Sequence, residues 1–332
     1  MNGFITLDYE LSMGSYTGTP EMSLIEPMNH LTAITDKYGI KMNVFVDAAY
    51  LLQLHKLRDK YPLLQKDFRT VTEHVKALDA AGHSIQLHLH PQWCYSTYDG
   101  KRWKLDVDHY KLSDMPIDDQ KLLIKEGTSL LNSMITKKVT AFRAGGYSIE
   151  NFAELYDTFL SVGITVDSSV YRGNTAKGKY NAYDYSRVPK KTSWVFLKNH
   201  KVENNKGEMT EYPISTIVVQ AVRYLINKNA SHPEFNDIQS SKTVWGDGKG
   251  LGAPGSPMHK FIRKIQMLFG NKAIRASIEE SVNLEKVYKY AKGHYSGEDF
   301  VIIGHPKNIS PFSVAVLDRF ISNHPEIDFK CF

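Results

Sequence analysis

The chain has 332 residues, of which 42% are hydrophobic and 23% charged, as in an ordinary globular protein that can bury a sizeable core. Its net charge of +5 is spread along most of the sequence and is too weak to indicate nucleic-acid binding. This charge would suit an anionic substrate, although a solvated basic surface is the more common explanation.

Two cysteines, Cys94 and Cys331, provide no disulfide framework and fit a reducing compartment. The N-terminus enters a strand pattern at once, without the features of a signal peptide. No apolar run approaches the length of a membrane span. We therefore expect a cytoplasmic protein with no transmembrane segment.

Strands and helices alternate through the first part of the chain. Residues 3–7 predict a buried strand, and residues 12–20 predict a loop over its C-terminal end. The periodicity then predicts, in order, a helix over 22–38, a strand over 41–47, helices over 48–57 and 68–81, and a strand over 82–93. The order β-α-β-α-β is typical of a parallel sheet.

The same alternation continues after an expected polar loop or hairpin at 97–116. The pattern predicts a helix over 118–134, a strand over 139–142, a helix over 151–162, a strand over 164–166 and, near the C-terminus, a strand over 300–303. Side chains that could take part in catalysis or metal binding follow nearly every predicted strand. Barrel enzymes carry their active sites at these C-terminal strand ends, so the pattern favours an α/β barrel in one domain spanning 1–332.

The alternation weakens between residues 171 and 256, where we expect an irregular insertion. Within or beside it the sequence predicts a strand over 212–217, a helix over 218–226, a mobile glycine-dense loop over 245–252 and a basic amphipathic helix over 257–269. A lipid surface or lipid-linked substrate could use that basic helix, although a solvated face is more common. The glycine spacing matches no phosphate-binding loop.

The strand over 82–93 carries the most distinctive pattern. His88 and His90 are two residues apart, so their imidazoles project to the same face of a strand. A carboxylate from a neighbouring strand end would complete three protein ligands and leave a position for water, as hydrolytic zinc sites require. Asp8 and Glu10, after the first strand, offer that carboxylate.

Five motifs at strand ends resemble those of the polysaccharide deacetylase superfamily, the NodB-homology enzymes of carbohydrate esterase family four. They are Thr6-Leu7-Asp8-Tyr9-Glu10, Gly82-His83-Ser84-Ile85-Gln86-Leu87-His88, Arg143-Ala144-Gly145-Gly146-Tyr147, Asp167-Ser168-Ser169-Val170 and Ile303-Gly304-His305-Pro306. The resemblance covers residues 3 to about 310 and looks most like the branch associated with surface polysaccharide or O-antigen biosynthesis. It implies a distorted (β/α)7 barrel with an irregular insertion before the last motif strand.

The resemblance also implies roles for the first two motifs. Asp8 falls on the catalytic base, Glu10 on a metal-binding acid and His88 on the first metal histidine, and the assignments of Asp8 and Glu10 are exchangeable. The family's second histidine lies four residues after the first, where this chain has Gln92. His90 is the available replacement, and Gln92 or a water could also contribute a ligand. The implied metal is most often zinc, with cobalt, nickel or manganese as alternatives.

The later motifs imply the remaining catalytic groups. Arg143 matches the arginine that orients the base, and the turn at Gly146 matches the backbone donor region that holds the oxyanion. Asp167 and His305 match a pair in which the carboxylate fixes the histidine as the general acid. Trp93 and Tyr147 could form walls against sugar rings, although aromatic residues at strand ends more often simply pack.

The implied reaction is hydrolysis of an N-acetyl group on an amino sugar or polysaccharide. The carbohydrate substrate could be anionic or linked to a lipid. Amide hydrolysis of a non-sugar substrate such as a cyclic ureide remains an alternative, as does a metal-free carbohydrate-binding role. A glycosidase is disfavoured, because two acids two residues apart on one strand project side by side and cannot flank a glycosidic bond.

Overall fold

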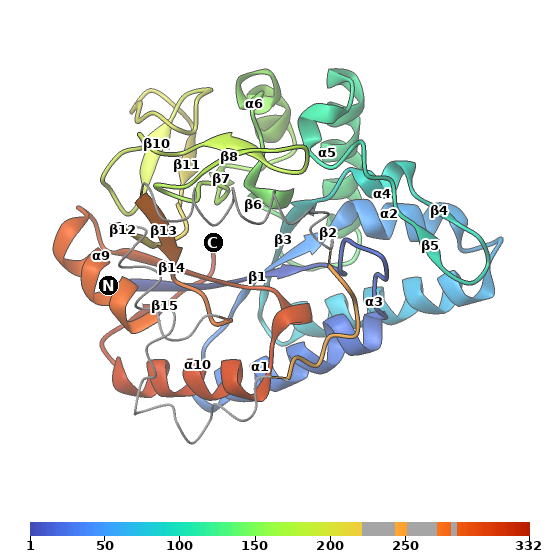
Figure 1. Ribbon diagram of the computed structural model, residues 1–332, viewed down its shortest axis with the longest axis horizontal. Coiled ribbons are helices and arrows are strands. Elements are labelled where there is room, and N and C mark those ends of the chain that lie inside the picture. The colour runs from blue at the N-terminus through green and yellow to red at the C-terminus, as the bar shows by residue number, and fades with distance from the viewer. Residues whose placement is uncertain (221–242, 251–270, 280–283) are drawn as a thin grey trace, which may run out of the picture.

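The computed structural model describes residues 1–220, 243–250, 271–279 and 284–332. Its centre is a sheet of parallel strands with helices on the outside (Figure 1). Seven parallel strands follow one another along the sheet in the order β14 (Asp299–Gly304), β1 (Asn2–Tyr9), β2 (Asn43–Asp47), β3 (Ser84–Leu89), β6 (Ala141–Ala144), β7 (Val166–Asp167) and β11 (Met209–Glu211). The short strand β15 (Asp328–Phe329) also pairs in parallel with the start of β1. Nearly every residue of β1, β2, β3, β6 and β14 is buried, as expected for parallel strands covered on both faces.

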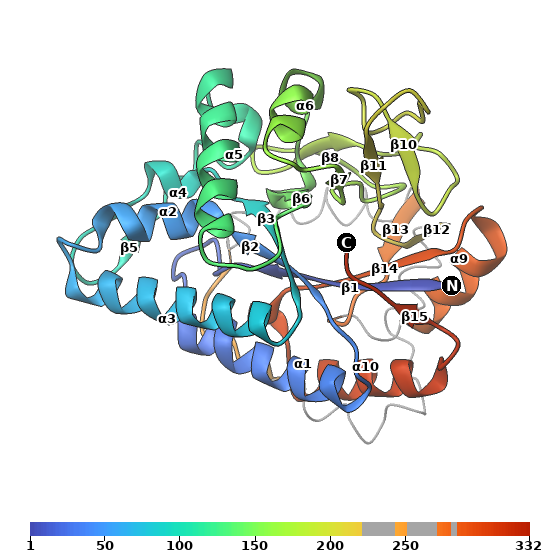
Figure 2. The ribbon, with the colours of Figure 1, turned by 180° about the vertical axis from the view of Figure 1, so that it is seen from behind.

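Helices follow most of these strands. Figures 1 and 2 show one group beside β1 and a second group on the side of β3 and β6. Among the described residues the α-helices are, in chain order, α1 (Glu26–Lys37), α2 (Ala48–Leu57), α3 (Pro62–Ala80), α4 (Gln92–Tyr95), α5 (Ile117–Asn132), α6 (Phe152–Ser161), α9 (Leu284–His294) and α10 (Pro311–Asn323). The buried faces of these helices and the apolar residues of the strands form one continuous hydrophobic core.

Irregular backbone closes the gap between β14 and β11. The N–H of Ser215 donates to the carbonyl of Val301 in β14 over 3.1 Å, and the N–H of Ala276 donates to the carbonyl of Ser215 over 2.7 Å. The N–H of Ile303 donates in turn to the carbonyl of Ala276 over 2.9 Å. Seven parallel strands closed in this way form a distorted (β/α)7 barrel, and the predicted fold class is confirmed.

The strand register brings the chemically interesting side chains to one end of the barrel. Asp47 lies opposite His88, and His88 lies opposite Arg143 on the next strand. Asp8 lies near the end of β1, opposite Phe45. Parallel strands therefore present these groups at the shared C-terminal edge, as the sequence predicts.

Several element boundaries differ from those expected. The helix predicted over 22–38 consists of a π-helical turn, Glu21–Ile25, followed by α1, and the left-handed Gly39, with φ of 68°, follows its end. Helix α3 begins earlier than predicted, at Pro62, because proline suits the first turn of a helix. The expected hairpin within 97–116 is present as β4 (Thr97–Tyr98) and β5 (Trp103–Lys104).

The described parts of the segment 171–256, residues 171–220 and 243–250, are more regular than expected. β11 and the antiparallel β10 (Trp194–Phe196) join the main sheet, and β8 (Thr175–Lys177) pairs with β9 (Ala182–Asp184) in a hairpin. The helix predicted to start at Val218 is wrong there, because β12 (Thr216–Gln220) pairs with β13 (Asn271–Arg275). The run Thr216-Ile217-Val218-Val219 is β-branched throughout, which favours a strand.

The remainder of that predicted helix, 221–226, and the basic helix predicted over 257–269 lie outside the described residues. Of the glycine-dense loop, 245–250 is described. Its Asp247 carboxylate accepts hydrogen bonds from the N–H of Thr19 and the hydroxyl of Ser23, over 2.9 and 2.8 Å. The loop is thus fastened to the 12–20 loop. No helix among the described residues has the length and apolar character needed to cross a membrane.

Candidate metal centre

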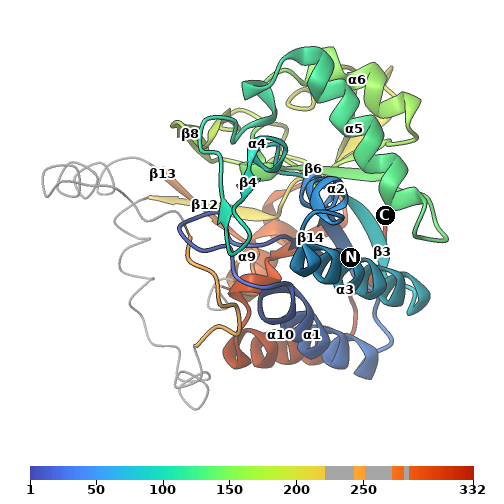
Figure 3. The same cartoon turned by 90° about the vertical axis from the view of Figure 1, so that its right-hand side faces the viewer.

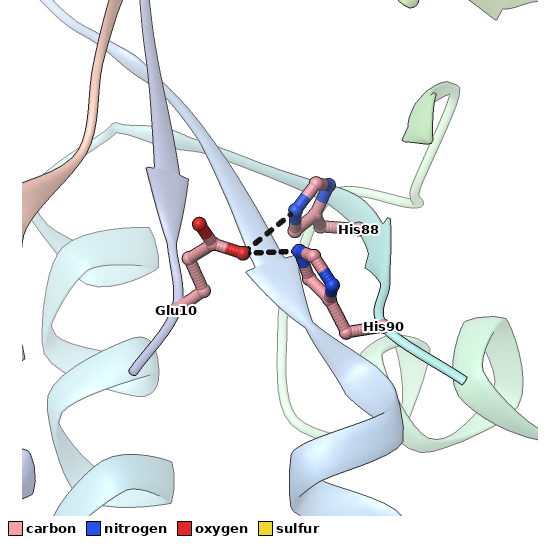
Figure 4. A group of neighbouring side chains, drawn as sticks. All are labelled: Glu10, His88 and His90. Carbon is pink, nitrogen blue, oxygen red and sulfur yellow. Dashed lines mark hydrogen bonds and ion pairs between the residues drawn. The ribbon is translucent and has the colours of Figure 1, made fainter. Parts of the chain in front are cut away.

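Three side chains converge at the C-terminal ends of β1 and β3. Figure 4 shows Glu10, just beyond β1, pointing toward His88 and His90 from β3 and its end. The Glu10 Oε2 atom lies 3.2 Å from His88 Nε2 and also contacts His90 Nε2. All three side chains are buried, and one ligand atom from each lies within 4.8 Å of the others. The structure therefore brings together the three predicted ligands.

The donor set fits a transition metal. Two imidazole nitrogens and one carboxylate oxygen are the ligands of hydrolytic zinc sites, and they also suit cobalt, nickel or manganese. His88 Nδ1 lies 2.8 Å from the backbone carbonyl of Arg143, which fixes the ring so that Nε2 faces Glu10. Metal-binding histidines commonly have such a partner on the second nitrogen.

The position of Gln92 explains why His90 takes the place expected for the second histidine. The Gln92 side chain turns away and donates to Met13 Sδ over 3.0 Å, whereas His90 joins the cluster. Gly145 allows the His90 ring its position, because a Cβ at Gly145 would lie 2.9 Å from that ring. A carboxylate that the sequence interpretation did not assign, Asp47, accepts from the His90 N–H over 3.2 Å.

Asp8 and Arg143 form a buried ion pair beside the cluster. Arg143 Nη1 lies 2.7 Å from Asp8 Oδ1, and the guanidinium has no exposed surface. The other guanidinium nitrogens donate to Ser168 and Thr6, and the Phe45 ring lies 4.4 Å away. Burial alone would raise the pKa of Asp8, but the charge of Arg143, helped by nearby histidines, lowers it. Asp8 is thus held as a carboxylate.

His305 faces both acids of the first motif. Its Nε2 lies 3.5 Å from Asp8 Oδ2 and 3.9 Å from Glu10 Oε1. Its Nδ1 lies 2.6 Å from Glu279 Oε1, and its backbone N–H donates to the same oxygen over 2.7 Å. The ring is therefore oriented with Nε2 toward the candidate metal centre.

The expected pairing of Asp167 with His305 is wrong, because Glu279 is the partner of His305. Asp167 lies on β7 opposite Glu211 of β11, and the two form a fully buried carboxyl pair. Asp167 also accepts from the Ser169 hydroxyl over 2.5 Å. Burial raises the pKa of Asp167 to about 6. The pKa of Glu211 is also raised, first by burial and then by the charge of the neighbouring Asp167. The pair belongs to the barrel wall.

This pair leads to a stability prediction. Both folded-state pKa values are raised, so the stability that the pair contributes is complete below pH 4 and falls as the pH rises through about 6. In Glu211→Gln the side chain at 211 is neutral at every pH, so the buried pair no longer has to bind a proton to lose one of its charges. The glutamine amide can also donate a hydrogen bond to Asp167. We expect it to be more stable than the wild type at pH 8 by roughly 1–3 kcal/mol.

Urea unfolding at pH 5, 6.5 and 8 would check this, with the exposed Glu208→Gln as the control. The advantage of Glu211→Gln should shrink toward pH 5. A variant that is less stable than the wild type at every pH would show that the carboxyl pair is not a source of strain.

Lys307 is a further group that the sequence interpretation did not assign. It lies in a short 3-10 turn, Pro306–Asn308, directly after His305. Its Nζ donates to Glu10 Oε1 over 2.7 Å and to the Leu11 carbonyl over 3.1 Å. Burial alone would raise the pKa of Glu10, but Lys307 and the two histidines hold it well below the usual value. One carboxylate oxygen of Glu10 thus faces the histidines and the other faces Lys307.

The three residues expected to contact substrate lie in different environments. Trp93 is completely buried against Tyr50 and Trp103, with ring centroids 4.7 and 5.1 Å apart, so it presents no face to a sugar. Gly146 adopts a left-handed conformation with φ of 57° in the turn after β6. The hydroxyl of Tyr147, in the same turn, accepts from Arg275 Nη1 over 2.6 Å. The expectation for Trp93 is therefore wrong, because the short helix α4 turns it inward.

No protein-family model matches the chain, and no curated protein matches it. Several solved structures are similar in outline, and three of them are described here by their similarity to this chain. A probable polysaccharide deacetylase from Pseudomonas aeruginosa PAO1 has a TM-score of 0.48 and 11% identity, over 98% of this chain and 85% of its own. The allantoinase Puue has a TM-score of 0.46 and 12% identity, over 98% and 84%. A candidate polysaccharide deacetylase from Mycobacterium smegmatis has a TM-score of 0.44 and 14% identity, over 91% and 72%. Identities of 11–14% with TM-scores of 0.44–0.48 carry no function over to this chain.

Proposed function

We propose that this chain is a metal-dependent hydrolase that removes N-acetyl groups from an amino sugar or polysaccharide. The observation that carries the proposal is the position of the Asp8 carboxylate, which lies between Arg143 and His305 and beside the Glu10, His88 and His90 cluster. Base, acid and metal ligands thus meet at one barrel end. The motif resemblance supports a carbohydrate substrate and a role in surface polysaccharide biosynthesis.

In this proposal Glu10, His88 and His90 hold the metal, with zinc favoured by two imidazoles and one carboxylate. A bound divalent ion supplies Lewis acidity, which makes water easier to deprotonate and polarises the acyl oxygen. Asp8 takes a proton from the attacking water, and Arg143 keeps it ionised for that task. The water oxygen bonds to the acyl carbon.

The second half of the reaction breaks the carbon–nitrogen bond. His305, oriented by Glu279, gives a proton from Nε2 to the departing nitrogen, which leaves as the free amine while acetate remains. Because Asp8 Oδ2 lies 3.5 Å from His305 Nε2, Asp8 can return its proton to His305 for the next cycle. The N–H groups of the turn at Gly146 and Tyr147 are the proposed donors to the oxyanion.

Two other functions share parts of this site. The same groups could hydrolyse a non-sugar amide such as a cyclic ureide, and substrate screening separates that from sugar deacetylation. A metal-free carbohydrate-binding protein is favoured by one observation, the Lys307 ammonium 2.7 Å from Glu10 Oε1, since a cation there neutralises the carboxylate without a metal.

Metal content tests the proposal first. We expect the purified protein to contain nearly one equivalent of a transition metal, and His88→Ala to lose it because one of three ligands is gone. The exposed His55→Ala should retain the metal and is the matched control. Elemental analysis and acetate release from N-acetylated sugars are the measurements. Absence of metal from the wild type, even after incubation with zinc, would favour the binding function.

A further inference from the structure

The two carboxylate oxygens of Glu10 face different partners. Its Oε2 lies 3.2 Å from His88 Nε2 and also contacts His90 Nε2. Its Oε1 accepts a hydrogen bond from Lys307 Nζ over 2.7 Å. Figure 4 shows one oxygen directed at the two imidazole rings and the other turned away from them. One oxygen is therefore free to serve as a metal ligand, while the other is already paired with an ammonium group.

The pair of Glu10 and Lys307 is sheltered from water. The side chains are 6% and 13% exposed, so solvent screens their attraction much less than it screens a surface ion pair. Lys307 Nζ also donates to the Leu11 carbonyl over 3.1 Å. If the Glu10 carboxylate turned to offer both oxygens to an ion, it would leave a largely buried ammonium with one of these two acceptors lost. Such a charge is costly, so the pairing holds the carboxylate in its orientation.

The backbone of Lys307 is braced as well. Gly246 lies against the Lys307 carbonyl so closely that no Cβ could be accommodated there. The N–H of Trp245 donates to the Ile309 carbonyl over 3.0 Å, just after the turn that carries Lys307. Figures 1 and 3 show this segment, 243–250, in orange beside the chain that follows β14. The ammonium is thus presented to Glu10 from a fixed base.

The orientation of Glu10 matters for a metal ion. A carboxylate can bind an ion through one oxygen or through both. Through one oxygen, Glu10, His88 and His90 fill three positions, and a four-coordinate ion keeps one for water, as hydrolytic zinc sites require. Through both oxygens, the protein supplies four ligand atoms, and water becomes a fifth ligand or is displaced. The pairing of Oε1 with Lys307 favours the first mode.

We propose that Lys307 is a positioning residue that restricts Glu10 to a single metal-binding oxygen and so keeps one coordination position open for water. Lys307 acts through Glu10 and not on the substrate. The arrangement weakens metal binding, because the lysine charge repels a divalent ion at the other oxygen of the same carboxylate. The inference rests on the proposed function, since it concerns a metal at this cluster, but coordination and affinity can be measured without turnover.

Visible absorption of the cobalt(II)-loaded protein tests the coordination. Four-coordinate cobalt absorbs several-fold more strongly than five-coordinate cobalt, and we expect the strong spectrum from the wild type. Lys307→Met has a side chain of similar length without the charge, so both Glu10 oxygens can bind and the absorption should fall several-fold. Lys307→Arg keeps a cation and should keep the wild-type spectrum. Lys249→Met, an exposed lysine in the neighbouring segment, is the matched control.

Metal affinity separates positioning from structural support. Competition with a chromogenic chelator should show that Lys307→Met binds zinc at least about tenfold more tightly than the wild type, because a repelling charge is gone and a second oxygen is available. A residue that merely supports the site would act in the opposite direction, since losing such a partner weakens metal binding by roughly 10–100-fold. If Lys307→Met does not fold, Lys307→Gln, which keeps a donor but not the charge, should still bind zinc more tightly.

The Lys307 inference and the hydrolase proposal can fail separately. Weaker zinc binding by the neutral variants, or a cobalt spectrum unchanged in Lys307→Met, would overturn the inference even if the wild type releases acetate. If the spectrum and the affinity change as expected but the metal-loaded wild type releases no acetate, the inference stands and the hydrolase proposal falls. A wild type that binds neither cobalt nor zinc would overturn both.

Discussion

Asp8→Asn should lower kcat for acetate release from an N-acetylated amino sugar by roughly 10²- to 10⁴-fold, the usual contribution of a general base. An asparagine oxygen can still accept from Arg143 Nη1, now 2.7 Å from the aspartate, but the amide cannot take a proton from water. Acetate release at saturating substrate is the measurement, with metal content determined on the same preparation.

Folding and metal loading must be controlled in this experiment, because a buried arginine that loses its charged partner is destabilising. Arg143 keeps hydrogen bonds to Ser168 and Thr6 in the variant, so we expect a lower Tm but a folded protein. Asp59→Asn serves as the control, since that side chain is exposed. A folded, metal-loaded Asp8→Asn protein with wild-type kcat would exclude Asp8 as the base.

The parts of the site that could be predicted from the sequence depend on strand periodicity. Alternation along β3 places His88 and His90 on one face, and the parallel order places Asp8 and Arg143 at the same barrel end. Alternation also explains why His90, rather than Gln92, joins the cluster with His88. His90 directly follows β3, whereas Gln92 already lies in the helix α4.

The parts that escaped prediction depend on how the barrel closes. Glu279 reaches His305 because residues 276–278 run beside β14, and no periodic pattern marks that short segment. Asp167 lies beside Glu211 instead, because β7 pairs with β11. The sequence did not indicate a strand at β11. Lys307 carries no signal beyond its position after His305.

His305→Gln provides the second large effect and identifies which proton the histidine moves. Acetate release from an amide should fall by roughly 10²- to 10⁴-fold, because the departing nitrogen must be protonated as it leaves. Hydrolysis of p-nitrophenyl acetate should change little, because a nitrophenolate leaves without a proton. Asp8→Asn should lower both activities, since both reactions require an activated water.

Glu279→Gln extends this argument to the group that positions His305. The glutamine oxygen can still accept from the His305 N–H and Nδ1–H, but the negative charge that stabilises a protonated ring is gone. We expect a loss of up to roughly 10²-fold, confined to the amide substrate. Equal losses on amide and ester in both variants would mean that His305 and Glu279 act on the water or on Asp8, which lies 3.5 Å from His305 Nε2, and the proton to the nitrogen would then need another source.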